Sequence, residues 1–245
     1  MGGGLRLDQL LVERGLFASR EQARRAVMAG AVAVDGRRVD KPGTATAAAA
    51  RLDVAATEPF VSRAGRKLAG ALSELEVDPA GLVCLDVGSS TGGFTDCLLQ
   101  RGASRVYAID VGYGQLDERL RRDPRVVVME RTNARHLPPD ALPEPAGLAV
   151  IDVSFISLVK VVPAIVPLLA PGALLLALIK PQFEAGRGAV GKGGILRDEA
   201  LRLRTIESCA AALAGLGLLP LGRIDSRLPG AGGNREAFAL FARPK

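Results

Sequence analysis

The sequence predicts an α/β fold built on a seven-stranded, mostly parallel sheet with helices on both faces. The first observation is an apolar run over residues 82–86, typical of a strand buried on both faces, that leads into a loop rich in glycine and hydroxyl side chains. The second is a helical spacing of apolar residues over 94–99, ended by Gly102, with another apolar run over 105–109. Together they make a βαβ unit. Further strands are predicted at 126–129, 148–151, 173–179, 218–224 and 237–241.

The composition excludes a disordered chain and shows where positive charge gathers. With 48% hydrophobic residues in a chain of 245, there is enough apolar surface for a large core and a second, smaller domain. Residues 1–67 hold twelve Lys or Arg against seven Asp or Glu, so most of the net charge of +6 lies there. This asymmetry predicts a polyanion or an acidic membrane surface as partner, with a merely solvated face as the alternative.

The three cysteines, at 84, 97 and 209, lie in apolar surroundings without the spacing of a metal site, and His136 is the only histidine. We therefore expect buried thiols in a reducing compartment and no metal. Because charged residues interrupt the first fourteen positions, no secretory segment is expected there, which predicts a cytoplasmic protein.

One segment raises the alternative of a membrane span. Residues 161–179 contain no charged side chain and are long enough to cross a bilayer. However, Pro163, Pro167 and a Pro171-Gly172 pair interrupt them. These breaks favour an apolar helix, a turn and a buried strand over 173–179.

The N-terminal residues predict two helices and a hairpin. One helix is expected over 5–14, and a second begins after Ser19, which forms a capping box with Gln22, and ends at Gly30. Asp35-Gly36 between two short apolar stretches is a strong hairpin signal. On the second helix Ala23, Ala26 and Val27 face inward, so Arg20, Arg24 and Arg25 fall on an exposed surface.

This run, RLDQLLVERGLFASREQARRAVMAGAVAVDGRRVDKPG, closely resembles the small α+β RNA-binding module named after small-subunit ribosomal protein S-four. A small helical cap with an ordinary charged face is the alternative. Guanidinium groups bind phosphates bidentately, which agrees with the resemblance. It implies RNA contacts by Arg6, Arg20, Arg24, Arg25, Arg37 and Arg38, and we extend the set to Arg63 and Arg66 on the following helix.

We place the domain boundary before Pro59, which gives an RNA-binding domain and linker over 1–58 and a second domain over 59–245. Residues 41–60 are rich in Ala, Thr and Pro and are expected to be a connection with one short apolar run. A helix capped by Ser62 should open the second domain. Residues 181–197, with five glycines and with cations that include Arg187 and Lys192, are expected to form a lid over RNA or, more plainly, an unstructured insertion.

The loop after the first strand predicts a ligand that contains adenosine. A small-residue loop lets backbone approach such a ligand, and the acid at the tip of the next strand, Asp110, would accept its ribose hydroxyls. A pyrophosphate fingerprint fails because Gly88 is followed two residues later by Ser90. The loop therefore favours S-adenosylmethionine over a dinucleotide, while a glycine turn without any ligand is the plain alternative.

Four charged residues are expected near the carboxyl edge of the sheet. Asp152 ends one strand, Lys180 follows another and Glu236 begins the last, while Lys67 belongs to the helix that enters the domain. Singly each reads as an ordinary surface charge, but only six lysines occur in the chain. Together they resemble the K-D-K-E tetrad of the FtsJ-type 2′-O-ribose methyltransferases.

The whole chain resembles the TlyA family of ribosomal RNA methyltransferases, through VSRAGRKL, DVGSSTGGFTD, IDVGYGQL, ERTN, DVSFISL, IKPQFE and GGNREAF. The resemblance implies a Rossmann-like class I fold and S-adenosylmethionine-dependent 2′-O-methylation of cytidines in one or both ribosomal subunits. Because some relatives are labelled haemolysins, a membrane-active protein is an alternative, and an inactive RNA-binding protein is another.

The resemblance also implies roles. Lys180 would be the general base for the ribose hydroxyl, and Lys67 would add a second positive charge that favours the neutral form of Lys180 and would help to hold the ribose. Asp152 and Glu236 would orient the two ammonium groups. The cofactor would be held by Asp86, Gly88, Ser89, Ser90, Thr91, Gly92, Gly93, Phe94, Asp110, Val111, Arg131, Thr132 and Asn133.

Overall fold

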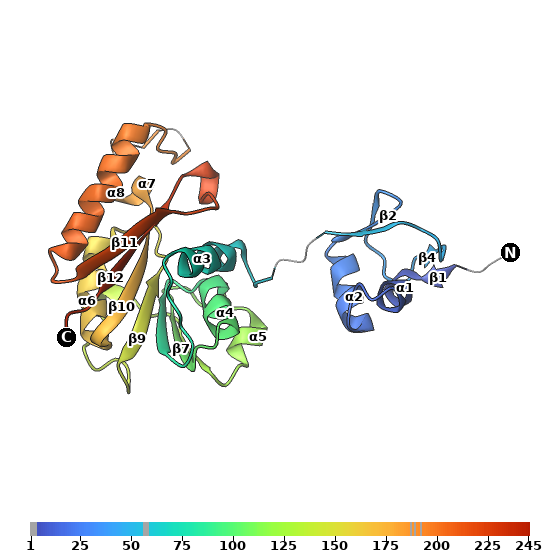
Figure 1. Ribbon diagram of the computed structural model, residues 1–245, viewed down its shortest axis with the longest axis horizontal. Coiled ribbons are helices and arrows are strands. Elements are labelled where there is room, and N and C mark those ends of the chain that lie inside the picture. Colours follow the sequence, from blue (N-terminus) through green and yellow to red (C-terminus); the bar gives the residue numbers. More distant parts are fainter. Residues whose placement is uncertain (1–3, 56–58, 187, 189, 192) are drawn as a thin grey trace. The chain divides into compact units, whose positions relative to one another are not determined.

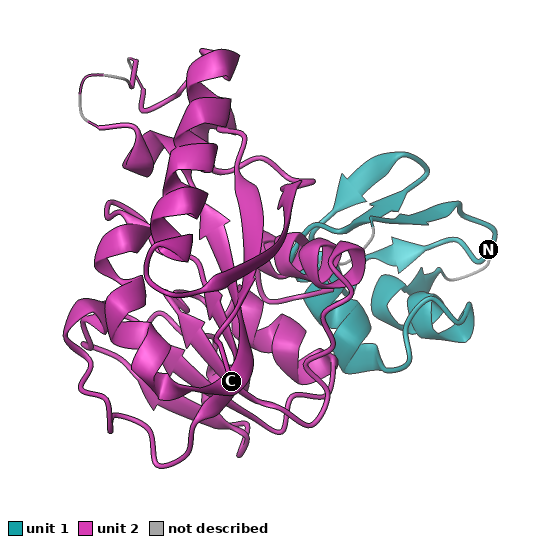
Figure 2. Cartoon of the chain, turned by 60° about the vertical axis from the view of Figure 1, so that its left-hand side comes forward, with its two compact units in different colours: residues 1–58 teal, residues 59–245 magenta. Residues whose placement is uncertain are grey.

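In the computed structural model the chain forms two compact units, residues 1–58 and 59–245 (Figure 2). The structure describes residues 4–55, 59–186, 188, 190–191 and 193–245. Residues 56–58 of the predicted linker, and Arg187 and Lys192 of the predicted lid, lie outside this set.

The N-terminal unit packs two helices and short strands around one small apolar core. The hairpin forms as predicted, because Asp35 and Gly36 both take the positive φ that its tight turn requires. The elements are β1 (Leu5–Arg6), α1 (Leu7–Glu13), α2 (Arg20–Met28), β2 (Val32–Val34), β3 (Arg37–Val39), β4 (Ala45–Thr46) and β5 (Leu52–Val54).

Two expectations for this unit need correction. The first helix begins at Leu7 and not at Leu5, because residues 5–6 pair with β4 instead. The stretch 41–60 is not a plain connection, since it supplies β4 and also β5, which pairs with β2 and completes a three-stranded sheet. Short strands of this kind carry little periodicity, and their pairing is decided by partners distant in sequence.

The C-terminal unit contains a seven-stranded sheet of order β11-β12-β10-β9-β6-β7-β8. Within the described part of this sheet β12 runs antiparallel to both of its neighbours, β10 and β11, while the pairs from β10 to β8 are parallel, so the predicted α/β fold is confirmed. Figure 1 shows α6 and α8 on one face and α3 and α4 on the other. The strands are β6 (Val83–Val87), β7 (Arg105–Ile109), β8 (Val126–Met129), β9 (Ala146–Ile151), β10 (Leu169–Ile179), β11 (Leu219–Asp225) and β12 (Ala237–Ala242).

Helices on the two faces bury two apolar clusters against the sheet. The longest, α8, begins after Asp198, whose carboxylate accepts a hydrogen bond from the Leu201 amide, as the cap pattern predicted. The α-helices are α3 (Arg63–Glu74), α4 (Gly93–Gln100), α5 (Glu118–Arg121), α6 (Val162–Ile165), α7 (Pro181–Glu184) and α8 (Glu199–Ala214), and 3-10 turns lie at Ala134–His136, Leu158–Lys160, Val166–Leu168 and Ala231–Gly233.

Three local expectations in this unit were wrong. Ser62 stands at the N-cap of α3, but its side chain makes no capping hydrogen bond. Pro171 and Gly172 do not precede β10 but lie inside it, where the pairing register with β9 shifts between Leu169 and Leu174. The predicted loop after Lys180 begins as a helical turn, α7.

The parallel register places the carboxyl ends of the central strands at one edge. Val87 pairs with Ile109 on one side and with Ile151 on the other, and Ile151 pairs with Ala177. The residues that follow these strands therefore converge at this edge, where ligands bind in open α/β sheets.

Candidate active site

The loop after β6 is held close to the neighbouring strand ends. Gly88 has φ +87°, and a Cβ atom built there would lie 2.4 Å from the carbonyl oxygen of Asp152. The amides of Gly88 and Ser89 both donate to the carbonyl of Ile109. A side chain at position 88 would push the loop away from both strands, so glycine is required here.

Two glycines bring α3 against the start of α4. A Cβ atom on Gly93 would lie 2.2 Å from Ser62 Oγ, and one on Gly65 would lie 2.4 Å from the ring of Phe60. The Val61 amide also donates to a carboxylate oxygen of Asp96 on α4, at 2.8 Å. This close contact fixes the helix that carries Lys67 beside the glycine-rich loop.

Asp110 ties the loop to the end of β7. One of its carboxylate oxygens accepts from the Ser90 amide at 2.8 Å, and the other accepts from the Gly112 amide at 2.7 Å. Ser90 takes the left-handed conformation, with φ +48°, to make this contact. The carboxylate is thus oriented by backbone while lone pairs on both oxygens stay available to a ligand.

Asp86 is fully buried in β6, beneath the loop. Its Oδ2 accepts from the Thr95 hydroxyl at 2.6 Å, and its Oδ1 has no hydrogen-bond partner among the described residues. Burial raises the pKa of this carboxyl to about 7, and the nearby carboxylates of Asp152 and Asp110 act in the same direction. The Thr95 hydrogen bond opposes the increase.

Two lysine–carboxylate pairs stand at the same edge of the sheet. Lys67 Nζ donates to Glu236 Oε2 at 2.6 Å, and these side chains are 11% and 2% exposed. Lys180 Nζ lies 2.6 Å from Asp152 Oδ1 and donates to Ser154 Oγ at 2.8 Å. Partial burial strengthens such pairs and fixes the position of each ammonium group.

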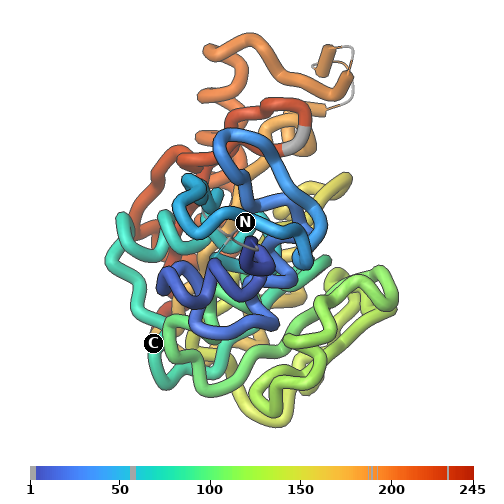
Figure 3. The backbone as a smooth tube through the Cα atoms, turned by 90° about the vertical axis from the view of Figure 1, so that its right-hand side faces the viewer, coloured from blue at the N-terminus to red at the C-terminus, as the bar shows by residue number. Residues whose placement is uncertain are grey.

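The turn before β12 holds Glu236 in place. A Cβ atom on Gly230 would lie 1.9 Å from Glu236 Oε1, so the backbone there packs directly on the carboxylate. Asn234 donates to the Gly194 carbonyl and accepts from the Leu196 amide, at 2.9 and 3.0 Å. In Figure 3 this red turn lies against the orange segment that precedes α8.

Two adjoining pockets open at this edge. The larger, of about 490 Å³, and the smaller, of about 270 Å³, share Gly88, Ser90, Asp152 and Ser154. The larger is lined mainly from the ends of β6, β7, β8 and β9, by residues that include Asp110, Val111, Thr132 and Asn133. Lining the smaller pocket are Ser62, Ala64, Gly88, Ser89, Ser90, Thr91, Gly93, Phe94, Asp152, Ser154 and Lys180.

The pockets do not include every residue expected around a cofactor. Arg131 lies outside both, with its guanidinium carbon 4.1 Å from the centre of the Tyr113 ring. Asp86 and Gly92 also lie outside: Asp86 beneath the loop, and Gly92 where a Cβ atom would meet Leu120. The positive φ of Gly92 and its contact with α5 give it a conformational role.

Several lining residues were missed by the sequence analysis. Gln115 approaches Ser90, and Ser154 bonds to Lys180, but neither was selected. Phe155 lines the larger pocket and is 90% exposed. The signal for the last two was present, because they belong to the segment DVSFISL directly after β9.

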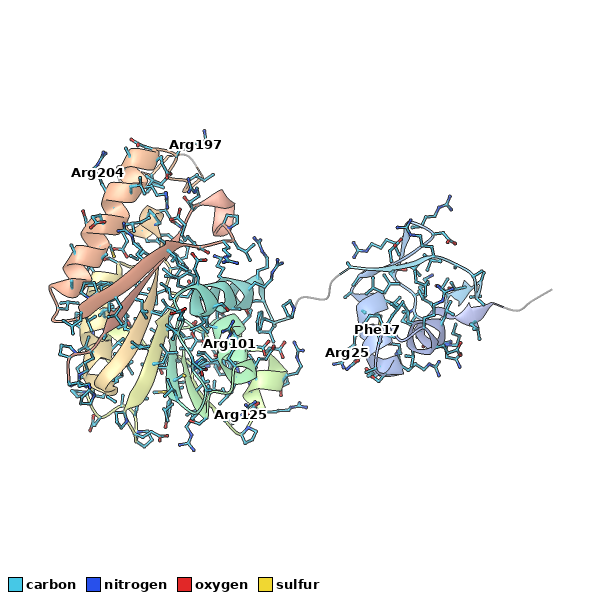
Figure 4. The ribbon with its side chains drawn as sticks, in the orientation of Figure 1. Phe17, Arg25, Arg101, Arg125, Arg197 and Arg204 are labelled. Atoms are coloured by element: carbon cyan, nitrogen blue, oxygen red, sulfur yellow. The ribbon has the colours of Figure 1, made fainter. Side chains whose placement is uncertain are left out.

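In the N-terminal unit the predicted RNA-binding arginines fall into two groups. Arg6 and Arg20 both donate to Asp8, which is fully buried, and the Arg6 hydrogen bonds lower the pKa of that carboxyl most. Arg38 donates to the Ala29 carbonyl. All six side chains are exposed, and Arg25 of the remaining group Arg24, Arg25 and Arg37 is labelled on α2 in Figure 4.

Arg63 and Arg66 are exposed on α3, in the C-terminal unit. They occupy the first turn and the start of the second turn of the helix that carries Lys67. Arg63 is four residues before Lys67, so the two side chains lie on the same face of the helix, and Arg66 is adjacent to Lys67 in the sequence.

Comparison with family models divides the chain at the same place as the fold. Residues 60–243 match the model of FtsJ-like methyltransferases, and residues 5–45 match that of the S4 domain. The chain is 48% identical to the 16S/23S rRNA (cytidine-2′-O)-methyltransferase TlyA of Mycobacterium tuberculosis, over 95% of this chain and 88% of that protein. It is 41% identical to Hemolysin A of Brachyspira hyodysenteriae, over 97% and 99% of the two chains.

Solved structures agree with this family assignment and with the fold. A Streptococcus thermophilus protein described as a candidate hemolysin is 40% identical and superposes with a TM-score of 0.76, covering 99% of this chain and 90% of that one. The N-methyltransferase NodS of Bradyrhizobium japonicum, in complex with S-adenosyl-L-homocysteine, superposes with a TM-score of 0.53 at 19% identity, covering 74% and 87%. This second likeness concerns the fold alone.

The membrane alternative has no helix to support it in the described part of the chain. None of the helices there combines the length and the apolar character that crossing a bilayer would need. The apolar segment 161–179 is divided between α6, a 3-10 turn and β10, all packed within the core of the C-terminal unit.

Proposed function

This chain belongs to the FtsJ-like methyltransferase family and to its TlyA relatives, and from that premise we propose that it methylates ribosomal RNA. The reaction is the S-adenosylmethionine-dependent transfer of a methyl group to the 2′-hydroxyl of a cytidine, in the small or large ribosomal subunit or in both. A protein with this substrate works in the cytoplasm, where ribosomes mature.

One observation carries the proposal: the two lysine–carboxylate pairs beside the glycine-rich loop. Lys180 lines the smaller pocket, which shares four residues with the larger one. A ribose hydroxyl is a poor nucleophile at neutral pH, so a site that methylates it must accept its proton and hold it in line with the methyl donor. A paired lysine at the junction of two pockets suits that task.

The larger pocket supports S-adenosylmethionine as the methyl donor. Asp110 offers carboxylate oxygens for ribose hydroxyls, while apolar side chains such as Ile109 and Ala134 suit the flat face of adenine. Hydroxyl and backbone groups, not cations, line the glycine-rich loop, which fits a ligand without phosphate. When bound there, the cofactor would supply an electrophilic methyl group on a sulfonium.

We assign the proton transfer to Lys180. In its neutral form Nζ accepts the hydroxyl proton as the 2′-oxygen forms its new bond to carbon. Asp152 and Ser154 hold Nζ in position and stabilise the ammonium group that results. With 12% of its side chain exposed, Lys180 can then release the proton to solvent.

Lys67 and Glu236 complete the site in this proposal. The Glu236 carboxylate holds Lys67 Nζ, which would place a positive charge near the ribose. The N-terminal unit, residues 1–58, would select a folded segment of ribosomal RNA through its exposed arginines.

The test is methyl transfer to isolated ribosomal subunits. Purified protein is incubated with radiolabelled S-adenosylmethionine and, separately, with small and large subunits that lack the modification. We expect label at defined cytidines, in linkages that resist alkaline cleavage because the 2′-oxygen is methylated. Label on a base, or none on either subunit or on naked ribosomal RNA, would contradict the proposal.

A further inference from the structure

Another pocket, of about 590 Å³, adjoins the candidate site and takes no part in the proposed reaction. We call it the flanking pocket; its lining includes Arg135, Phe155, Lys160, Gln182 and Phe183. It shares Arg135, Phe155 and Ile156 with the larger site pocket, so the two cavities meet along one wall. An RNA strand that enters the candidate site can therefore continue into the flanking pocket.

Two aromatic rings stand at this wall. Phe155 and Phe183 have their ring centres 5.0 Å apart, with planes inclined at 47°. Phe155 is 90% exposed and sits at φ +64°, a conformation that is rare for a bulky residue. An aromatic side chain so exposed and held in strained backbone indicates a contact surface for a ligand with a flat apolar face.

The charge of the flanking pocket is positive. Arg135 and Lys160 are exposed and form no ion pair within the described residues, and no Asp or Glu is among the described residues that line the pocket. Elsewhere in this unit arginines are neutralised, as Arg121 is by Glu130 and Arg125 by Asp123. Two such cations beside the exposed ring of Phe155 suit an anionic ligand that also contains aromatic groups.

A polar group in the pocket lacks a partner as well. The side-chain oxygen of Gln182 is buried and accepts no hydrogen bond from the described residues. A buried polar group without a partner costs free energy that a ligand can recover. The edge of a nucleobase offers the donors and acceptors that an amide needs.

We propose that the flanking pocket binds the nucleotide next to the methylated one, on the same single-stranded segment of RNA. Its phosphate lies at Lys160 and Arg135, and its base stacks on the ring pair formed by Phe155 and Phe183. Stacking on side chains requires an unpaired base, so the substrate is splayed from its helix at this point. This inference rests on the proposed function, because it deepens the RNA specificity of the same site.

The first experiment changes Lys160 to Gln and measures methyl transfer as a function of salt. Losing one phosphate contact should reduce the slope of log kcat/KM for RNA against log salt by about 1, and raise the KM for RNA several-fold. The kcat and the affinity for S-adenosylhomocysteine should not change. The matched control is Lys245→Gln, which removes the same charge near Gly172, away from the carboxyl edge of the sheet.

The second experiment changes Phe183 to Leu, which keeps apolar volume but removes the flat π face. Binding of hexacytidylate should weaken about fivefold or more if a base stacks there. Equal slopes for Lys160→Gln and Lys245→Gln, or unchanged hexacytidylate binding by Phe183→Leu, would overturn the inference. If the unaltered protein methylates no RNA, the proposed function has failed instead, and the two failures are distinguishable.

Discussion

The two units use ion pairs of similar composition in opposite ways. In the N-terminal unit a fully buried carboxylate, Asp8, lies under two arginines, and the side chains of Arg6 and Arg20 are 50% and 52% exposed. In the C-terminal unit both members of the two lysine–carboxylate pairs at the candidate site are enclosed, and the side chains of Lys67 and Lys180 are only 11% and 12% exposed.

The difference shows how exposure decides what a cation can do. Half-exposed guanidinium groups keep donors free for a phosphate, while the carboxylate beneath them fixes their direction. Enclosed ammonium groups are positioned for one atom of a substrate and are shielded from solvent. We therefore expect changes in the first set to alter RNA affinity, and changes in the second to alter turnover.

The largest effect should come from Lys180. Lys180→Ala should lower kcat by at least about a thousandfold, because the group that accepts the proton is lost. Binding of S-adenosylhomocysteine and of RNA should stay within about twofold of the unaltered protein, since Asp110 and the arginines are untouched. Single-turnover methylation with isothermal titration checks both. Normal methylation by Lys180→Ala would show that the enclosed pair is not catalytic.

The next effect concerns Asp86, a buried carboxylate that forms no ion pair within the described part of the chain. Its pKa of about 7 lies above the usual value of 3.8, so between about pH 4 and pH 7 the folded protein keeps a proton that the unfolded chain has lost. The free energy of unfolding of this unit should therefore fall as the pH rises through that interval, by up to about 4 kcal/mol. Asp86→Asn should remove this pH dependence.

Tyrosine fluorescence during urea unfolding measures the free energy of unfolding of the C-terminal unit selectively. The chain has no tryptophan, and its two tyrosines, Tyr107 and Tyr113, both lie in the C-terminal unit. The control is Asp123→Asn, because the hydrogen bond from Arg125 lowers the pKa of Asp123 and its stabilisation is lost only as the pH falls. A slope that survives in Asp86→Asn would mean that another buried group titrates.

A smaller effect is expected at Asp8. Asp8→Asn keeps the shape but removes the charge that holds Arg6 and Arg20, so the affinity for ribosomal RNA should fall about three- to tenfold. At saturating RNA, kcat should be unchanged. Glu13→Gln makes the same change of charge on the exposed side of α1 and should leave affinity nearly as it was. A loss of kcat in Asp8→Asn would contradict the inference that the N-terminal pairs set RNA affinity and not turnover.

The smallest effect should follow from single exposed arginines. Replacing Arg24 and then Arg25 by Gln should weaken RNA binding about threefold each and lower the salt dependence stepwise. Arg204→Gln on α8, which Figure 4 shows in the C-terminal unit, serves as the control. RNA-binding titrations at three salt concentrations measure this dependence. If the slopes for the Arg24 and Arg25 variants equal the slope for the control, these arginines do not contact RNA.

Much of this molecule could be predicted from local patterns. The strand at 105–109, the strand at 126–129 and the Asp35-Gly36 hairpin appear where apolar runs and turn residues placed them. The four members of the lysine–carboxylate set could be selected because three of them follow or begin predicted strands, and parallel strands end at a common edge. Local signals suffice when the element is regular and buried.

Other features could not be predicted because they depend on distant contacts. The strand at 52–54 exists because β2 offers it an edge, and the proline and glycine inside β10 are tolerated because the register shifts there. Arg131 follows β8, as the sequence predicted. However, its backbone takes a left-handed conformation, with φ +55°, and its guanidinium group lies over the ring of Tyr113, outside the two site pockets.

The sequence alone determined the fold class, the glycine-rich loop and the types of residue at the site, because hydrophobic period and turn chemistry act between near neighbours. Tertiary structure alone decided which lysine pairs with which carboxylate, since Lys67 and Glu236 are 169 positions apart and meet only after the sheet has formed. It also decided that Asp8 is neutralised by arginines while Asp86 is not. Distance and burial, which set these electrostatic energies, are properties of the folded chain and not of the amino-acid sequence alone.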